Sequence, residues 1–268
     1  MIDRLMDTGE KTWAVLRSCF GQILILHIAY VALGFIVFSP LAGFIGRLLL
    51  QASGNSVMAD MDILFFLLTP FGMVTLVLFG SILVTIFAFE QASIITICAG
   101  NIQGYKIAPI QVLFATLRRF YTLFLFSIHL ITRLLIIIVP FLALAGAIAW
   151  FTITDHDINY YLSVKPPAFI AAAVIIGCIL LVLLVVLTHK LIGWSLSLPL
   201  TMFNGTSPSE SFKQSRQLLT GQRFIVFTSF TIWLFITFVL SFLVLGGIQF
   251  LGSNLISFFH DSLSAMVL

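Results

Sequence analysis

The sequence predicts an all-α polytopic integral membrane protein, a helical bundle with about five transmembrane helices plus short interfacial helices. Of its 268 residues, 60% are hydrophobic and only 9% are charged, whereas soluble domains carry roughly a quarter charged residues. The mean hydropathy is +1.17. Five stretches are long and apolar enough to cross the hydrocarbon of a bilayer, which takes about 20 helical residues. A soluble globular fold is therefore excluded, and most of the surface must face lipid.

The predicted membrane helices follow one another along the chain with short connections. They cover residues 14–38, 71–100, 120–154, 168–187 and 224–251. Acidic residues near the N-terminus argue against a cleavable signal peptide, so we expect the first stretch to remain as a membrane helix. Several stretches exceed the minimum length, which predicts tilting or bending, and Pro140 predicts a bend in the third.

Three shorter segments lie between these stretches. Residues 41–51 are apolar apart from one arginine, and we expect them to lie at the membrane interface. The apolar run 191–203 either extends the fourth membrane helix or lies along the bilayer, and the sequence leaves both open. Ser207, Pro208 and Glu210 predict the start of a short helix, because serine caps a helix, proline suits its first position and glutamate completes a capping box.

Lysine and arginine residues indicate the orientation of the chain. Ten of the 13 fall on the N-terminal flank and in the loops at 101–119 and 188–223, whereas the alternate loops at 39–70 and 155–167 hold two. Cytoplasmic loops carry the excess of positive charge, so we predict a multi-pass protein of the cytoplasmic (inner) membrane with a cytoplasmic N-terminus. No basic run interleaved with aromatic residues occurs, so we expect no nucleic-acid partner.

Four ionisable residues are predicted to form a polar cluster within the membrane. Glu90 and Arg133 lie about 16 and 20 Å from the cytoplasmic ends of their helices at 1.5 Å per residue, so they can meet as an ion pair. His129 lies one turn before Arg133, and His27 reaches a similar depth in the first helix. Such groups either form a structural ion pair or mark a substrate or proton pathway, and both interpretations stay open.

Two surfaces are candidates for contact with lipid head groups. The inner candidate consists of Lys213, Arg216 and Arg223, and the outer one of Tyr160, Tyr161 and Lys165. Cations near an anionic membrane surface attract lipid head groups, although the inner set also suits ordinary positive-inside charge. Asp155, His156 and Asp157 are adjacent, but three neighbouring residues rarely converge on one ion, and we expect Asp157 to cap a short helix. We therefore expect no metal, cofactor or catalytic residue in this chain.

Two motifs resemble the membrane domain that precedes the catalytic domain in bacterial glycerophosphodiester phosphodiesterases. The outer motif is Asp157-Ile158-Asn159-Tyr160-Tyr161-Leu162 followed by Lys165-Pro166-Pro167-Ala168-Phe169. The inner motif is Trp194, Leu198-Pro199-Leu200, Gly205, Ser207-Pro208, Ser215, Leu218 and Gly221. The resemblance implies a membrane module followed by a TIM-barrel phosphodiesterase that uses a divalent metal. A barrel needs about 250 residues of its own, so we expect residues 1–268 to be the membrane domain alone, cut from a longer protein.

These observations favour a domain that anchors a phosphodiesterase and presents lipid or substrate in glycerophospholipid metabolism. The expected partners are membrane lipids and, if the chain is a fragment, a C-terminal phosphodiesterase domain. The alternative is a stand-alone membrane transporter or scaffold, because intramembrane ionisable groups often mark transport pathways.

Overall fold

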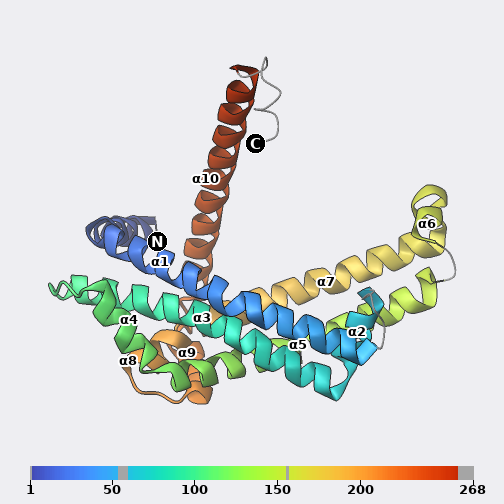
Figure 1. Ribbon diagram of the computed structural model, residues 1–268, viewed down its shortest axis with the longest axis horizontal. Helices are drawn as coiled ribbons and strands as arrows, with labels where there is room; N and C mark the ends of the chain where they lie inside the picture. The colour runs from blue at the N-terminus through green and yellow to red at the C-terminus, as the bar shows by residue number, and fades with distance from the viewer. Residues whose placement is uncertain (1, 54–59, 155–156, 259–268) are drawn as a thin grey trace. The chain divides into compact units, whose positions relative to one another are not determined.

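The computed structural model describes residues 2–53, 60–154 and 157–258, and in these ranges every regular element is an α-helix (Figure 1). The helices are α1 (Ile2–Ser53), α2 (Asp60–Leu68), α3 (Pro70–Ile102), α4 (Pro109–Leu117), α5 (Phe120–Ile153), α6 (Ile158–Val164), α7 (Pro167–Trp194), α8 (Ser197–Phe203), α9 (Pro208–Leu218) and α10 (Arg223–Phe258).

Five helical segments are long and apolar enough to cross a membrane. They are Gly9–Phe44, Pro70–Ile102, Phe120–Ile153, Pro167–Phe203 and Arg223–Ser253. Each coincides with one predicted stretch, and the predicted third stretch extends one residue beyond its helix. The predicted all-α fold with five membrane-spanning helices is therefore confirmed.

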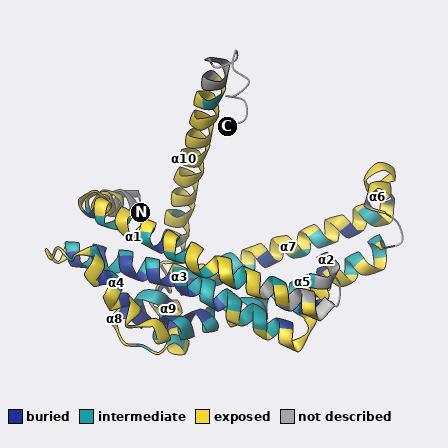
Figure 2. Cartoon of the chain, in the orientation of Figure 1, coloured by how far each residue is buried: buried dark blue, intermediate teal, exposed yellow. Residues whose placement is uncertain are grey.

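The chain divides into two compact units. The larger is Met6–Leu219 and contains α2 to α9 with nearly all of α1. The smaller contains α10 together with the first residues of the chain. The side chains of α10 are exposed along most of its described length, and many of them are aromatic (Figure 2). Such a surface is suited to lipid rather than water.

Two prolines lie inside long helices without ending them. α1 continues through Pro40 to Ser53, so residues 41–51 are the last part of α1, and their expected position at the membrane interface stays a prediction. α5 likewise continues through Pro140. Proline removes one main-chain hydrogen bond, but the remaining hydrogen bonds can carry a helix past it, especially in long apolar helices.

Within the fourth apolar segment, α7 ends at Trp194, and α8 follows as a separate short helix. Pro199 has no N–H group to continue the α7 hydrogen-bond pattern. Side chains satisfy the last carbonyl groups of α7 instead: Ser215 Oγ donates to Gly193 O at 2.7 Å, and Ser197 Oγ donates to Trp194 O at 2.5 Å. The apolar run 191–203 is thus divided between the end of α7 and α8.

The short helix predicted after Ser207 is α9. Ser207 Oγ accepts a hydrogen bond from the backbone N–H of Glu210 at 3.4 Å, and proline occupies the first position. The helix ends at Leu218, shortly before Gly221, whose φ of 85° is a left-handed conformation that suits glycine. The predicted N-terminal cap is confirmed.

Most buried side chains of the larger unit lie in one part of it, which we call the packed end: residues 15–30, 85–133 and 191–219 (Figure 2). Three buried hydroxyl groups of the packed end are paired with one another. Tyr30 Oη lies 2.8 Å from Ser93 Oγ, which lies 3.1 Å from Thr116 Oγ1, and these three side chains join α1, α3 and α4. In contrast, most side chains of residues 167–188 of α7 are exposed.

Candidate functional site

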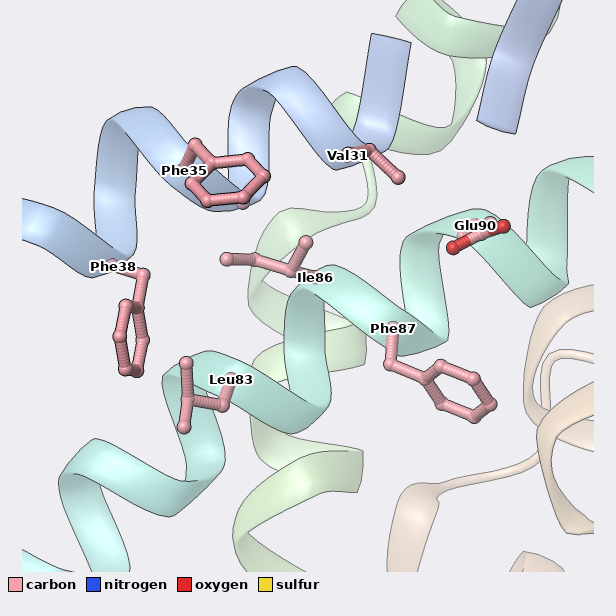
Figure 3. Close-up of a pocket in the computed structure, with 8 residues that line it drawn as sticks. Val31, Phe35, Phe38, Leu83, Ile86, Phe87 and Glu90 are labelled. Atoms are coloured by element: carbon pink, nitrogen blue, oxygen red, sulfur yellow. The ribbon is translucent and has the colours of Figure 1, made fainter. Parts of the chain in front are cut away.

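His27 and Glu90 form a hydrogen-bonded pair between α1 and α3, which is an ion pair when His27 is protonated. His27 Nδ1 lies 2.7 Å from Glu90 Oε1, and the two side chains are 55% and 18% exposed. Glu90 also lines an apolar groove of about 390 Å³ between the same helices. Figure 3 shows Glu90 at one end of this groove and Phe38 and Leu83 at the other. The pair therefore joins α1 to α3 beside a space suited to an apolar chain.

The predicted ion pair between Glu90 and Arg133 is wrong. Within the described residues, Glu90 pairs with His27, and Arg133 lies with its Cζ 4.6 Å from the centre of the Phe212 ring. Arg133 Nη2 also donates to Ser209 O at 3.2 Å. Similar depth allowed a pair, but depth along a helix does not determine the direction in which a side chain points. Arg133 faces α9, and Glu90 faces α1.

His129 does not join the other members of the predicted cluster. Its Nδ1 lies 2.8 Å from the carbonyl oxygen of Leu125, one turn earlier in α5. The predicted four-residue cluster is thus divided into a pair (His27 with Glu90), a cation of α5 that faces α9 (Arg133) and a histidine that contacts its own helix.

Phe212 of α9 is the centre of the contact between α9, α5 and α7. Its side chain is 0% exposed. The Phe126 ring stacks on it at 5.2 Å, and the Trp194 ring meets its edge at 5.5 Å. Ser215 strengthens this contact, because its hydroxyl donates to Gly193 O and accepts from the N–H of Leu196. α9 is therefore packed against the membrane helices.

The predicted inner set of cations is only partly brought together. The charges of Arg216 and Arg133 interact, and the Arg216 side chain passes over Gly193, where an added Cβ would lie 3.2 Å from Arg216 Cγ. Lys213 is mostly exposed and lies 3.9 Å from Glu210. Arg223 begins α10 in the other unit. The cationic site that the structure forms is thus Arg133 with Arg216.

The predicted outer residues have mainly packing roles. Tyr161 is buried and stacks on Phe169 of α7 at 5.3 Å, and Tyr160 meets the Tyr161 ring edge-on. Lys165 ends α6 in the left-handed conformation with φ of 50°. Asp157 occupies the N-cap position of α6, but its carboxylate accepts from Asn159 Nδ2 at 3.0 Å rather than from the backbone. Asp155 and His156 lie outside the described residues.

A second cavity, of about 270 Å³, lies at the packed end and was not predicted from the sequence. Residues of α3, α5, the end of α7 and α8 line it, among them Gln91 and Trp194. The Trp194 Nε1 atom is buried and has no hydrogen-bond partner among the residues that the structure describes. A buried, unpaired donor is identifiable only from the packing of several helices, although tryptophan at this position was part of the inner motif.

Convergent metal ligands are not found in the part of the chain that the structure describes: no three His, Cys, Asp or Glu side chains there could hold one ion. The described carboxylates lie apart on α1, α3, α9 and the start of α6. These residues therefore do not fit the divalent metal that the phosphodiesterase resemblance implies for a catalytic domain.

Comparison with known proteins agrees with the fold and with the membrane character of the chain. The family model described as the membrane domain of glycerophosphoryl diester phosphodiesterase matches residues 10–268. The chain matches no curated protein and no solved structure. Because the match covers nearly the whole sequence, the chain belongs to the family of glycerophosphoryl diester phosphodiesterase membrane domains.

Proposed function

We propose that this domain anchors a phosphodiesterase in the cytoplasmic membrane and holds a glycerophospholipid by its phosphate at Arg133 and Arg216. The observation that carries the proposal is the position of Arg133, between a long apolar run of α5 and the polar helix α9. The family supports the link to phosphodiesterase chemistry, and the remaining argument concerns where lipid head groups meet the helices.

The charged and histidine residues divide four helices into two parts. Runs of 19 to 22 residues without Asp, Glu, Lys, Arg or His cover 28–46, 70–89, 134–153 and 167–188. Each run is about as long as the 20 residues that cross a bilayer. Each run has one histidine or charged residue directly beside the end that faces the same side of the membrane; these residues are His27, Glu90, Arg133 and His189. The contact between His27 and Glu90 supports a common level for these ends.

In this placement, the polar residues lie at the boundary of the hydrocarbon rather than in the middle of the membrane, where they were expected from the sequence. α5 has 34 residues, so it is about 51 Å long, which exceeds the hydrocarbon by about 20 Å. The surplus corresponds to Phe120–Arg133, the part against which Phe212 of α9 packs. Arg133 then lies at the level of lipid phosphates rather than in hydrocarbon.

The charge of the packed end supports its location on the cytoplasmic side. The loops at 101–119 and 188–223 carry seven of the ten cations that indicated the orientation. An inside N-terminus can be checked by labelling single cysteines at Ser163 and Ser209, which should react from opposite sides of the membrane.

Arg133 has the chemistry that a phosphate site needs. Its guanidinium rests on the Phe212 ring and gives one hydrogen bond to Ser209 O, and most of its five N–H groups remain able to donate elsewhere. Within the described residues, Arg133 has no carboxylate partner. Arg216 adds a second positive charge close by. A phosphate between two arginines would accept bidentate hydrogen bonds and relieve their repulsion.

Native mass spectrometry of the purified chain in detergent tests this proposal. Phosphatidylglycerol should be retained in preference to zwitterionic phosphatidylcholine. Arg133→Gln and Arg216→Gln should each reduce that preference by about tenfold, because each removes a charge-assisted hydrogen bond. Lys106→Gln makes the same charge change in the loop before α4 and should leave the preference intact. If all three variants lost the same amount of preference for phosphatidylglycerol, the preference would come from the overall positive charge rather than from a site. If neither arginine variant lost any preference, the phosphate site would be refuted.

Transport is the second candidate function, and the ion pair between His27 and Glu90 is the observation that favours it. The pair lies beside the groove between α1 and α3, and paired ionisable groups in membrane helices often carry protons. Proteoliposomes should show no proton-coupled uptake of glycerophosphodiesters if the anchoring and lipid-presenting function holds. Uptake that Glu90→Gln abolishes would establish transport instead.

A further inference from the structure

A further cavity at the packed end is not used by the proposed function. It has a volume of about 360 Å³ and lies between the start of α5 and the segment that joins α8 to α9. The start of α5 contributes Arg119, Tyr121 and Thr122 to its lining, and the segment before α9 contributes Gly205, Thr206 and Ser207. Gly205 and Ser207 belong to the inner motif, so this motif forms part of the cavity wall.

The walls of this cavity are held in place by the protein itself. The Arg119 guanidinium donates to Met202 O, which joins the start of α5 to the end of α8. Gly205 has a φ of 63°, a left-handed conformation that suits glycine, and Ser207 caps α9. The lining groups are therefore positioned before a ligand binds, which lowers the entropic cost of binding.

The lining groups surround one positive charge with hydrogen-bond donors. Arg119 has five N–H groups and gives one of them to a backbone carbonyl, so the others remain able to donate. The hydroxyl groups of Tyr121, Thr122 and Ser207 add further donors. Among the described residues that line the cavity there is no Asp or Glu, and Glu210 of α9 is paired with a lysine of its own helix. The cavity therefore favours an anion.

A phosphate ester suits these donors better than a carboxylate does. Its three acceptor oxygens point in different directions, which matches donors that come both from α5 and from the segment before α9, and two of them can accept a bidentate pair from arginine. The volume of about 360 Å³ corresponds to about twelve water-sized groups at roughly 30 Å³ each. It therefore exceeds a phosphate ion and leaves space for a small hydroxylated body beside the remaining hydroxyl groups.

The distance from Arg133 distinguishes a soluble ligand from a lipid. Arg119 and Leu125, which both line the cavity, lie fourteen and eight residues before Arg133, or about 21 and 12 Å along the helix axis at 1.5 Å per residue. In the proposed membrane placement, Arg133 lies at the level of lipid phosphates. The cavity then lies farther into the cytoplasm, where water-soluble molecules reach it.

We infer that this cavity binds a small, water-soluble phosphate ester whose body carries hydroxyl groups. The Arg119 guanidinium and the Thr122 hydroxyl donate to the phosphate oxygens, and the Ser207 hydroxyl contacts the body. This inference goes beyond the proposed function, because the ligand is soluble and its site is separate from Arg133 and Arg216.

Calorimetric titration with glycerol 3-phosphate tests the inference, with the chain in nanodiscs of zwitterionic phosphatidylcholine. The wild-type chain should bind this probe saturably in the millimolar range or below, whereas glycerol, which lacks the phosphate, should not bind. Arg119→Gln should weaken binding about tenfold or more, because it removes a charge-assisted hydrogen bond. Arg118→Gln makes the same change at an exposed neighbour that is not part of the lining, and should keep the wild-type affinity.

A second variant keeps the test decisive. Thr122→Val removes one hydroxyl group, keeps the size of the side chain and leaves the contact between Arg119 and Met202 in place. It should weaken binding about three- to tenfold, so a folding defect in Arg119→Gln does not decide the outcome. Absence of saturable binding by the wild-type chain, or an equal loss in Arg118→Gln, would refute the site.

The lipid-retention assay distinguishes the two sources of a phosphate group. If Arg119→Gln lost the preference for phosphatidylglycerol while the wild-type chain failed to bind glycerol 3-phosphate, the cavity would hold a lipid head group, and the inference of a soluble ligand would be wrong. Arg133→Gln and Arg216→Gln should keep the wild-type affinity for glycerol 3-phosphate. Failure of the lipid phosphate site would therefore leave this second site intact.

Discussion

Helices α3, α5 and α7 are apolar along most of their length, yet their two halves are buried to different extents. At the packed end, Phe89, Leu123 and Phe212 are almost completely covered. Along residues 167–188 of α7, Ala172 and Leu183 are the buried side chains and most others are exposed. Helices surrounded by lipid gain no hydrophobic free energy by associating, whereas water strongly favours the burial of apolar surface. This difference in burial is the one expected if the packed end lies in water and the apolar runs face lipid, as in the proposed membrane placement.

The largest effect is expected for Phe212→Ala, which removes the centre of the contact between α9, α5 and α7. We expect a loss of about 3 kcal/mol in unfolding free energy, because the substitution leaves a cavity under Phe126, Trp194 and Arg133. Reversible unfolding in mixed micelles measures it. Phe151→Ala makes the same change at a ring that is 82% exposed, and should cost far less. Equal losses would contradict the distinction between the two regions.

The polar contacts of the packed end should give the next largest effect. Tyr30→Phe removes the hydroxyl that contacts Ser93, and we expect a loss of about 1–2 kcal/mol because a buried partner loses a hydrogen bond. Combination with Ser93→Ala should be non-additive. The matched control is Tyr121→Phe, which alters an exposed tyrosine and should change stability by less than about 0.5 kcal/mol.

The boundary between the two regions should show a smaller coupling. His27→Leu and Glu90→Leu should be coupled by about 1 kcal/mol or less in a double-mutant cycle, since His27 is more than half exposed. Glu90→Leu combined with Arg133→Leu should be additive, because these side chains face different helices. Strong coupling between Glu90 and Arg133 would contradict this arrangement and support the ion pair that the sequence predicted.

The smallest effect is expected in the lipid-facing region. Leu181 lies in the middle of the α7 apolar run and is 64% exposed, so Leu181→Ala should change the unfolding free energy by less than about 0.5 kcal/mol. A loss of 2 kcal/mol or more would indicate that this surface packs against another protein rather than lipid.

The sequence was sufficient for the features that depend on composition and on local chemistry. Apolar length identified five membrane-spanning helices, and Ser207 with Pro208 identified the start of α9. Both follow from rules that act within about 20 residues, namely the thickness of hydrocarbon and the capping of unpaired N–H groups. The break between α7 and α8 had a local signal too, in Pro199.

The candidate site could not be predicted in the same way, because its contacts join distant segments. Depth counted along helices placed Glu90 and Arg133 at similar levels, but the partner of Arg133 is Phe212, a residue 79 positions later. From the sequence, only the cations of α9 were candidates for contact with head groups, so Phe212 was not included. Trp194 lies beside residues of four helices, and its N–H is unpaired among the described residues. No spacing in the sequence predicts an arrangement that joins such distant segments.

The most direct test of lipid binding at the packed end uses Trp194 as its own reporter. A variant with Trp13, Trp150 and Trp233 replaced by phenylalanine retains Trp194 alone, and a second variant retains Trp150 alone. Both are placed in nanodiscs of phosphatidylglycerol with dibrominated acyl chains, which quench tryptophan fluorescence only on contact. The account predicts quenching of Trp194 despite its 7% exposure, because a lipid whose phosphate lies at Arg133 and Arg216 lies beside the Phe212 ring that Trp194 contacts. Quenching of Trp150 with Trp194 unaffected would show that no lipid lies at the packed end and would contradict the account.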